Sequence, residues 1–179
     1  MSDDRLARAL DAYTQLVLEW APKLDLVSPG DLARFQDRHI SDSLRALPLL
    51  EGSGAGPFAD VGSGAGLPGI PLAVASGRYV RLIEPRKRRA AFLEECLRRL
   101  GISGEVVAET AEQAAREDRL ARAHSVVVAR ALAAPEEALR LVFPLVAPGG
   151  LAVIYLGASA KIPPGSEEFV PGIAIVRAE

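Results

Sequence analysis

A glycine-rich turn between two apolar segments contains the residues best suited to bind a ligand. The run 58–61 (FADV) includes an acid, Asp60, and leads into 62–66 (GSGAG), after which apolar residues resume with helical spacing. This order predicts a strand, a tight turn and a helix. Glycine has no Cβ, so it suits a place where the backbone turns sharply or where a ligand lies almost on the main chain. We therefore expect a nucleotide-like ligand at this turn.

Two classes of ligand use such a turn, and they need different spacings. A dinucleotide site needs G-x-G-x-x-G, in which the third glycine allows close packing of helix on strand. Leu67 stands in the place of that third glycine, so the dinucleotide pattern is absent. The pattern present is acid-x-G-x-G-x-G, which resembles the first motif of class I S-adenosylmethionine-dependent methyltransferases. This resemblance implies cofactor contacts from the acid and the three glycines, Asp60, Gly62, Gly64 and Gly66.

A second acid follows at the distance that such a nucleotide site requires. The run 79–83 (YVRLI) predicts the next strand, and Glu84 stands at its carboxyl end. An acid in a loop is usually solvated, but about 20 residues after a glycine turn it can accept both hydroxyls of a ribose. We therefore interpret Glu84 as a cofactor ligand.

Composition limits the classes of protein and of site. The 179 residues are 49% apolar, which allows one domain with a sizeable core, and the net charge of −2 means that an RNA partner would need a local basic patch. A single cysteine, Cys96, excludes a disulfide framework, and with only His39 and His124 as imidazoles we expect no metal site. The N-terminus lacks an apolar signal core, and no apolar run reaches about 18 residues. We expect a cytoplasmic monomer that does not enter a membrane.

Two amphipathic helices precede the glycine turn. Apolar residues spaced by three and four predict a helix over 3–20 that ends at Pro22, with Trp20 in the core. A second helix is predicted over 31–50, with a break near His39. The turn-rich segment 52–57 then leads to the first strand, so we expect a helical extension, 1–57, packed on a core domain, 58–179.

The second helix brings four polar residues within one turn of one another: Arg38, His39, Asp42 and Ser43. A serine–histidine–acid triad would need an exposed nucleophile beside an oxyanion hole, and nothing in this segment builds one. We interpret the group as a polar cluster that fastens the helix to the core domain, with Arg38 and His39 as candidate substrate contacts.

Four consecutive basic residues open the helix predicted over 85–100: Arg86, Lys87, Arg88 and Arg89. Cations at a helix N-terminus oppose the macrodipole by roughly 0.3–1 kcal/mol each. Two interpretations stay open for them, a solvated helix face and a local patch that binds the substrate RNA.

Three further strands are predicted over 105–109, 125–129 and 151–156, the last preceded by a turn at 148–150. Strands that alternate with helices predict a parallel sheet with a ligand crevice outside the carboxyl ends of its strands. The candidate residues at this edge are Asp60, Gly62, Glu84, Glu112 and Arg130.

Five motifs together resemble the RsmG family, also called glucose-inhibited division protein B. They are RHISDSL, DVGSGAGLPGIPL, LIEPRKRRAAFLEE, VVARALA and APGG, within residues 25–157. The resemblance implies a Rossmann-like, mostly parallel seven-stranded sheet with helices on both faces, and methylation of nitrogen-7 of a guanine in bacterial small-subunit ribosomal RNA. It also implies cofactor contacts at Gly62, Leu67, Ala111, Glu112 and Arg130. The chain departs from the family at Leu156, where a lysine is common, and in ending at VPGIAIVRAE.

The implied reaction needs positioning and not acid–base catalysis, because nitrogen-7 of guanine carries a lone pair and no proton. We therefore expect no catalytic base. Arg130 is a candidate partner for the methionine carboxylate of the cofactor or for an RNA phosphate. Two other functions stay open: a class I methyltransferase acting on a small molecule or protein, and a ribosome-assembly protein that binds without turnover.

Overall fold

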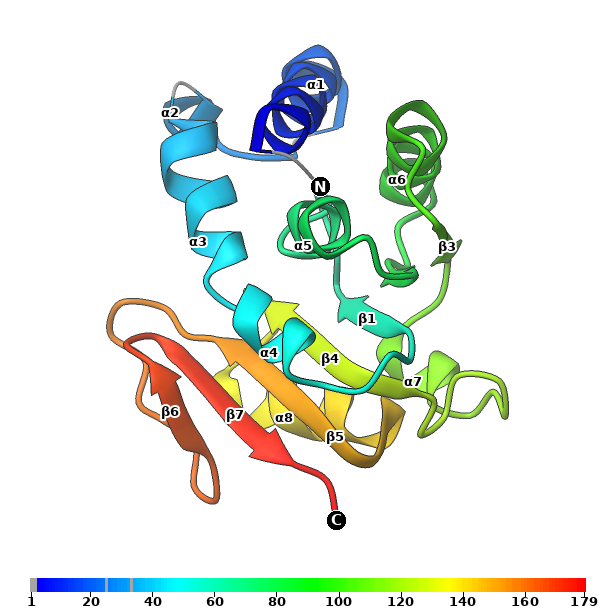
Figure 1. The fold of residues 1–179 in the computed structure, drawn as a ribbon, viewed down its shortest axis with the longest axis vertical. Helices are drawn as coiled ribbons and strands as arrows, with labels where there is room; N and C mark the ends of the chain where they lie inside the picture. The colour runs from blue at the N-terminus through cyan, green and yellow to red at the C-terminus, as the bar shows by residue number, and fades with distance from the viewer. Residues whose placement is uncertain (1–2, 25, 33) are drawn as a thin grey trace.

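The computed structural model describes residues 3–24, 26–32 and 34–179, and this part of the chain contains one seven-stranded sheet (Figure 1). Its order is β3-β2-β1-β4-β5-β7-β6. Strands β1 to β5 pair in parallel, whereas β7 pairs antiparallel with β5 and β6 antiparallel with β7. The predicted mostly parallel sheet is confirmed. The strands are β1 (Phe58–Val61), β2 (Val80–Ile83), β3 (Gly104–Val107), β4 (His124–Arg130), β5 (Val146–Tyr155), β6 (Glu167–Val170) and β7 (Ile173–Arg177).

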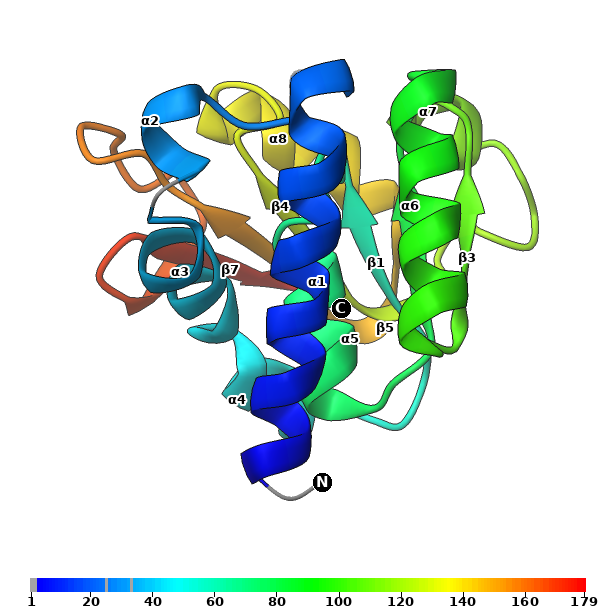
Figure 2. The ribbon, with the colours of Figure 1, turned by 90° about the horizontal axis from the view of Figure 1, so that it is seen from above.

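Alternate residues of the central strands serve two separate apolar cores. In β4, Val126 and Val128 belong to one cluster of buried side chains, whereas Val127 and Ala129 belong to the other. This follows from the period of two along a strand, which places neighbours on opposite faces. The first face is covered by α1 (Asp3–Leu24), α5 (Gly69–Ser76) and α6 (Lys87–Leu100), and the second by α7 (Ala111–Ala114) and α8 (Pro135–Val142), as Figures 1 and 2 show. Leu145 of the 3-10 turn η2 (Phe143–Leu145) also belongs to the second cluster.

The strand order reverses direction between β1 and β4. From β1 the chain moves outward through β2 to β3, and it then returns to place β4 on the other side of β1. The loops that leave the carboxyl ends of these two strands therefore diverge, which opens a crevice where ligands bind in sheets of this kind.

The first helix is longer than the sequence predicted. α1 continues to Leu24 with Pro22 inside it, so the predicted end at Pro22 is wrong. A proline near the end of a helix removes only its own hydrogen bond, and buried Ala21 keeps this last turn on the core. Trp20 is half-buried and packs against the edge of the core, with 5.8 Å between its ring centroid and that of Phe92.

The predicted helix over 31–50 is divided into pieces. It consists of α2 (Pro29–Leu32), the π-helix η1 (Phe35–Ile40), α3 (Ser41–Leu44) and α4 (Leu47–Glu51), and residue 33 within the predicted range lies outside the described residues. The expected break near His39 corresponds to the change from π-helix to α-helix after Ile40. A π-turn widens the helix locally and is frequent at functional sites. Among the described helices, none has the length and apolar character of a membrane span.

Two predicted boundaries also differ. α6 begins at Lys87 and not at residue 85. Arg86 has an extended backbone, and its amide donates a hydrogen bond to Glu84 Oε1 at 2.9 Å. The turn predicted at 148–150 lies inside β5, where the pairing with β4 shifts register between His124 and Val126. Such a bulge lets one strand hold extra residues without ending the pairing.

Candidate functional site

The glycine turn between β1 and α5 has a backbone that other residues would not adopt readily. Gly62, Gly64 and Gly66 have φ values of +71°, +57° and +93°, in the region that favours glycine. A Cβ on Gly66 would lie 2.5 Å from Ile70 Cγ1, whereas a Cβ on Gly64 would meet nothing closer than 3.7 Å. The turn is thus tightly packed beneath Gly66 and open above Gly64.

Two buried carboxylates hold this turn in place. Asp60, which is 0% exposed, accepts a hydrogen bond from the amide of Gly69 at 3.0 Å through Oδ2. Glu84, 3% exposed, accepts the amide of Gly64 at 2.9 Å through Oε2. The structure therefore assigns both carboxylates a positioning role. Their direct contact with the cofactor stays a prediction.

Asp60 makes the stability of the fold depend on pH. Burial raises the pKa of Asp60 to about 7, against the opposing hydrogen bond from Gly69, whereas an unfolded aspartate titrates near about 3.9. Between these two pKa values, Asp60 therefore carries a proton in the folded chain, and unfolding releases that proton. Its contribution to the free energy of unfolding is therefore greatest below about pH 4 and falls as pH rises towards 7, by at most about 1.4 kcal/mol per pH unit.

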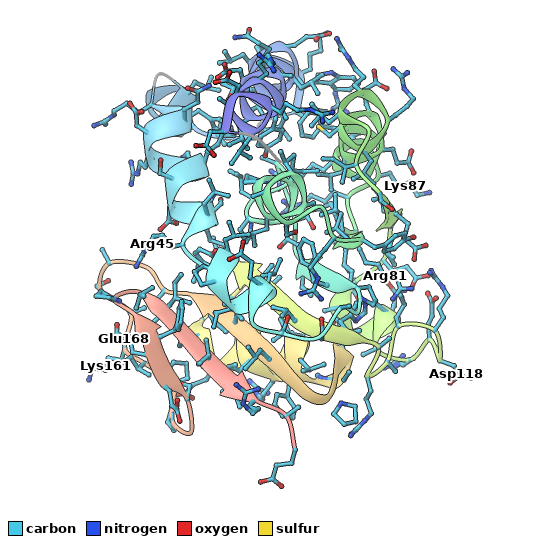
Figure 3. All side chains as sticks on the ribbon, in the orientation of Figure 1. Arg45, Arg81, Lys87, Asp118, Lys161 and Glu168 are labelled. Atoms are coloured by element: carbon cyan, nitrogen blue, oxygen red, sulfur yellow. The ribbon has the colours of Figure 1, made fainter. Side chains whose placement is uncertain are left out.

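We expect Asp60→Asn to remove this dependence. Denaturant titrations at pH values from 4 to 7 give the free energy of unfolding of the variant and of the wild type. The variant's value minus the wild-type value should become more positive as pH rises. Asp118→Asn is the control, because Asp118 is exposed on the loop after α7 (Figure 3). If the free energies of unfolding of Asp60→Asn and of the wild type changed with pH in parallel, the raised pKa of Asp60 would be contradicted.

A cavity of about 270 Å³, here called the turn cavity, opens above the glycine turn. Its walls come from the turn, from the end of β4, from the start of α6 and from the helical extension. Because these segments lie far apart in sequence, the cavity exists only in the folded chain. The described residues lining it are Leu26, Val27, Ser28, His39, Gly62, Ser63, Gly64, Ala65, Leu67, Arg89, Arg130 and Ala131.

The helical extension also supports the turn from beneath. Tyr13 of α1 is fully buried and donates a hydrogen bond from its hydroxyl to the carbonyl of Ala65 at 2.7 Å. In the sequence, Tyr13 is one of the residues spaced by three and four along the apolar face of the helix predicted over 3–20. The signal that could have found it was its hydroxyl, since a buried tyrosine usually finds a hydrogen-bond partner.

Arg130 connects the end of β4 to the extension. Its Nη1 lies 3.3 Å from Asp42 Oδ2, and its Nη2 lies 3.3 Å from His39 Nδ1. Asp42 Oδ1 also accepts a hydrogen bond from Arg45 at 2.9 Å, and Arg45 reaches the carbonyl of Pro171 beside the β6–β7 turn (Figure 3). The predicted polar cluster therefore fastens the extension to the core. Ser43 is buried and donates to the carbonyl of His39 at 2.6 Å, which does not suit a nucleophile.

A second cavity, of about 320 Å³, lies beside the first at the ends of β4 and β5, and is here called the β4–β5 cavity. Arg130 and Ala131 line both cavities. Ala131 has a φ of +54°, which is uncommon for a residue with a side chain and is often found at functional sites. The other described lining residues are Asp42, Ala129, Leu132, Ala133, Pro135, Ala138, Ile154, Tyr155, Leu156, Gly157 and Ala160.

The remaining predicted site residues lie around the same edge of the sheet. Ala111 and Glu112 form the first turn of α7, which follows β3, and among the described residues they line neither cavity.

The basic residues at the start of α6 are divided between the surface and the turn cavity. Arg86, Lys87 and Arg88 are exposed, and Figure 3 shows Lys87 at the outer side of α6. Arg89 lines the turn cavity, whereas Arg88 donates to the carbonyl of Lys23 at 2.9 Å. Arg38 lies exposed on η1. In the described ranges no three His, Cys, Asp or Glu side chains are grouped as metal ligands.

Comparison with known proteins gives one consistent result. The family model GidB, described as rRNA small subunit methyltransferase G, matches residues 6–168. The protein named ribosomal RNA small subunit methyltransferase G of Granulibacter bethesdensis is 41% identical over 152 residues, covering 85% of this chain and 68% of the relative. The protein of the same name from Acidiphilium cryptum is 40% identical over 154 residues, covering 84% and 68%.

Solved structures agree on the fold. A protein from Corynebacterium glutamicum has a TM-score of 0.59 at 15% identity, covering 99% of this chain and 91% of that one. A geranyl diphosphate methyltransferase solved with S-adenosylmethionine has a TM-score of 0.55 at 17% identity, covering 72% of this chain and 56% of its own. At 15% and 17% sequence identity, this similarity supports a shared fold alone.

Proposed function

This chain belongs to the GidB family of rRNA small subunit methyltransferase G, and from that membership we propose that it methylates nitrogen-7 of a guanine in bacterial 16S ribosomal RNA. The methyl donor is S-adenosylmethionine. The observation that carries the proposal is the convergence of the glycine turn and Arg130 on one cavity at the β1–β4 switch of the sheet. A glycine turn that only connected a strand to a helix would not need a cavity shared with Arg130.

The described residues fit the cofactor. Gly64 leaves open space above the turn, and Arg89 and Arg130 bring two guanidinium groups to the turn cavity, which suits the carboxylate of a methionine. Each oxygen of Glu84 accepts one amide and keeps a lone pair for a ribose hydroxyl. We propose that the cofactor is held by these residues together with Asp60, Gly62, Gly66, Leu67, Ala111 and Glu112.

Positioning is sufficient for this reaction. When bound, S-adenosylmethionine supplies an electrophilic methyl group on a cationic sulfur. Nitrogen-7 has its lone pair available, so the chain needs to orient the guanine and exclude water, and no side chain needs to remove a proton. Arg130 would repel a nearby sulfonium if it stood alone, and the carboxylate of Asp42 at 3.3 Å offsets that charge.

The substrate partner is small-subunit ribosomal RNA, as free RNA or within a small subunit. We further propose that the protein acts in the cytoplasm as a monomer, with residues 1–57 as an extension and 58–179 as the methyltransferase core. Tyr13 and Phe35 of the extension share one cluster of buried side chains with Phe58 and Phe92 of the core. This supports an extension that packs on the core within a single structural domain, so the two parts should fold together.

The product can be located chemically. Methylation at nitrogen-7 gives guanine a fixed positive charge, so borohydride reduction followed by aniline should break the RNA at the modified position. Small-subunit RNA from cells lacking this protein should gain one scission site after incubation with the purified protein and S-adenosylmethionine. Free RNA and small subunits are tested separately. Cofactor binding without scission on either would favour the ribosome-assembly protein, with Leu156 in the β4–β5 cavity as the first residue to test. If the protein methylated a small molecule or another protein and not RNA, the class I methyltransferase with that kind of substrate would be favoured.

We expect the exposed basic residues at the start of α6 to bind RNA phosphates. Arg86→Gln with Lys87→Gln should leave cofactor affinity unchanged and reduce the slope of log affinity against log salt by about 0.7–0.9 for each phosphate that the variant no longer neutralises. The control is Arg98→Gln with Arg99→Gln, which removes the same charge from the other end of α6. Equal slopes for the two double variants, measured by RNA titration at several salt concentrations, would indicate a solvated face.

A further inference from the structure

We infer that the β4–β5 cavity receives the guanine base, and that Arg130 and Asp42 bind its edge. This inference rests on the proposed function and adds a place and a recognition mechanism for the substrate. The cavity has apolar walls, including Leu132, Ile154 and Leu156, and two charged side chains on its lining. An apolar pocket with a few convergent polar groups is the usual form of a small-ligand site.

The chemistry of RNA explains why a base must enter a pocket. Nitrogen-7 faces the major groove, and in A-form RNA this groove is too deep and narrow for protein side chains to reach. Enzymes that act on a base take it out of the stack and hold it in a pocket. A cavity that adjoins the turn cavity is therefore needed, and the β4–β5 cavity meets this condition because both share Arg130 and Ala131.

The order of groups on guanine matches the order of residues in the structure. Along the edge of the base, O6 lies between nitrogen-7 and N1–H, and O6 is an acceptor whereas N1–H and the 2-amino group are donors. Along the cavities, Arg130 lies between the turn cavity and Asp42. With Arg130 donating to O6 and Asp42 accepting from N1–H and the 2-amino group, nitrogen-7 faces the turn cavity.

Both side chains retain capacity for these bonds. Asp42 uses Oδ1 for Arg45 and Oδ2 for Arg130, and each carboxylate oxygen has a second lone pair. Arg130 has five N–H donors, of which Nη1 and Nη2 each have one described partner, so donors remain for O6 of guanine as well as for the carboxylate of the cofactor. Their mutual contact also orients both groups before the base arrives, which reduces the entropy cost of binding.

The test compares RNA carrying guanosine or inosine at the methylated position, because inosine lacks the 2-amino group. Wild-type protein should have a kcat/KM about 10- to 100-fold lower with inosine, as for removal of a hydrogen bond to a charged group. Asp42→Ala should reduce this ratio to near one. If Asp42 were only structural, the variant would slow both RNAs equally and keep the wild-type ratio, which would overturn the inference.

A second variant tests the cavity without changing its charges. Gly157 lines the cavity and a Cβ there would meet nothing within 4 Å, so Gly157→Leu should fold and obstruct the base. We expect kcat/KM to fall at least tenfold with cofactor affinity unchanged. Gly54→Leu, also in open space but in the linker before β1, is the matched control. Full activity of Gly157→Leu would overturn the inference, whereas wild-type protein that never methylates guanosine RNA would instead overturn the proposed function.

Discussion

Arg130→Ala should reduce methyl transfer to ribosomal RNA by about 100- to 1,000-fold, the usual cost of removing one preorganised electrostatic contact at a reacting centre. Arg130 lines both cavities and its side chain is 17% exposed, so water would replace it poorly. The measurement is single-turnover transfer of labelled methyl groups. The fold should survive, because Asp42 keeps Arg45 as its partner at 2.9 Å and no buried charge is left unpaired.

Two further variants separate the roles of Arg130. Arg130→Lys keeps the charge but loses the planar fork, so activity should recover only in part. Arg45→Ala removes the other cation from Asp42, and among the described residues Arg45 lines neither cavity, so its effect on transfer should be small. If Arg45→Ala were as inactive as Arg130→Ala, the salt bridges would be maintaining the fold and not the site.

Gly64→Ala should weaken S-adenosylmethionine binding by about 1–3 kcal/mol, the usual cost of an added side chain in a filled space, which corresponds to about 5- to 150-fold in Kd. Gly64 has a φ of +57° and a Cβ there points into space bounded by Arg89 Nη1 at 3.9 Å. That space belongs to the turn cavity, so the methyl group would compete with the cofactor. Calorimetric titration gives Kd directly.

Gly77→Ala is the matched control for Gly64→Ala. Gly77 ends α5 with a φ of +68° and a Cβ there meets nothing within 4 Å. Both substitutions therefore impose the same kind of backbone strain, about 1–2 kcal/mol for a side chain in the left-handed region. Their melting temperatures should fall by similar amounts, whereas only Gly64→Ala should change Kd. An equal Kd for the two variants would mean that the cofactor does not lie against Gly64.

Local sequence patterns predicted five of the seven strands, whereas the seven-stranded sheet was implied by the resemblance to the RsmG family. Strand 125–129 (SVVVA) is apolar after Ser125, strand 58–61 (FADV) is apolar apart from Asp60, and the glycines at 62, 64 and 66 mark a turn that few other residues could form. Helix boundaries were less predictable. Pro22 stays inside α1 because tertiary packing of Ala21 outweighs the absence of one hydrogen bond, and α6 starts late because Glu84 holds the amide of Arg86.

Residue types at short and regular spacings were sufficient to predict the class of fold, the position of the glycine turn and the family. The tertiary structure shows which groups each side chain contacts. It placed Asp60 and Glu84 behind the turn, brought Tyr13 beneath Ala65, and set Arg130 between two cavities against Asp42. Tyr13 and Ala65, like Asp42 and Arg130, are far apart in the chain. Their pairing results from packing the helical extension on the sheet, which no local spacing encodes.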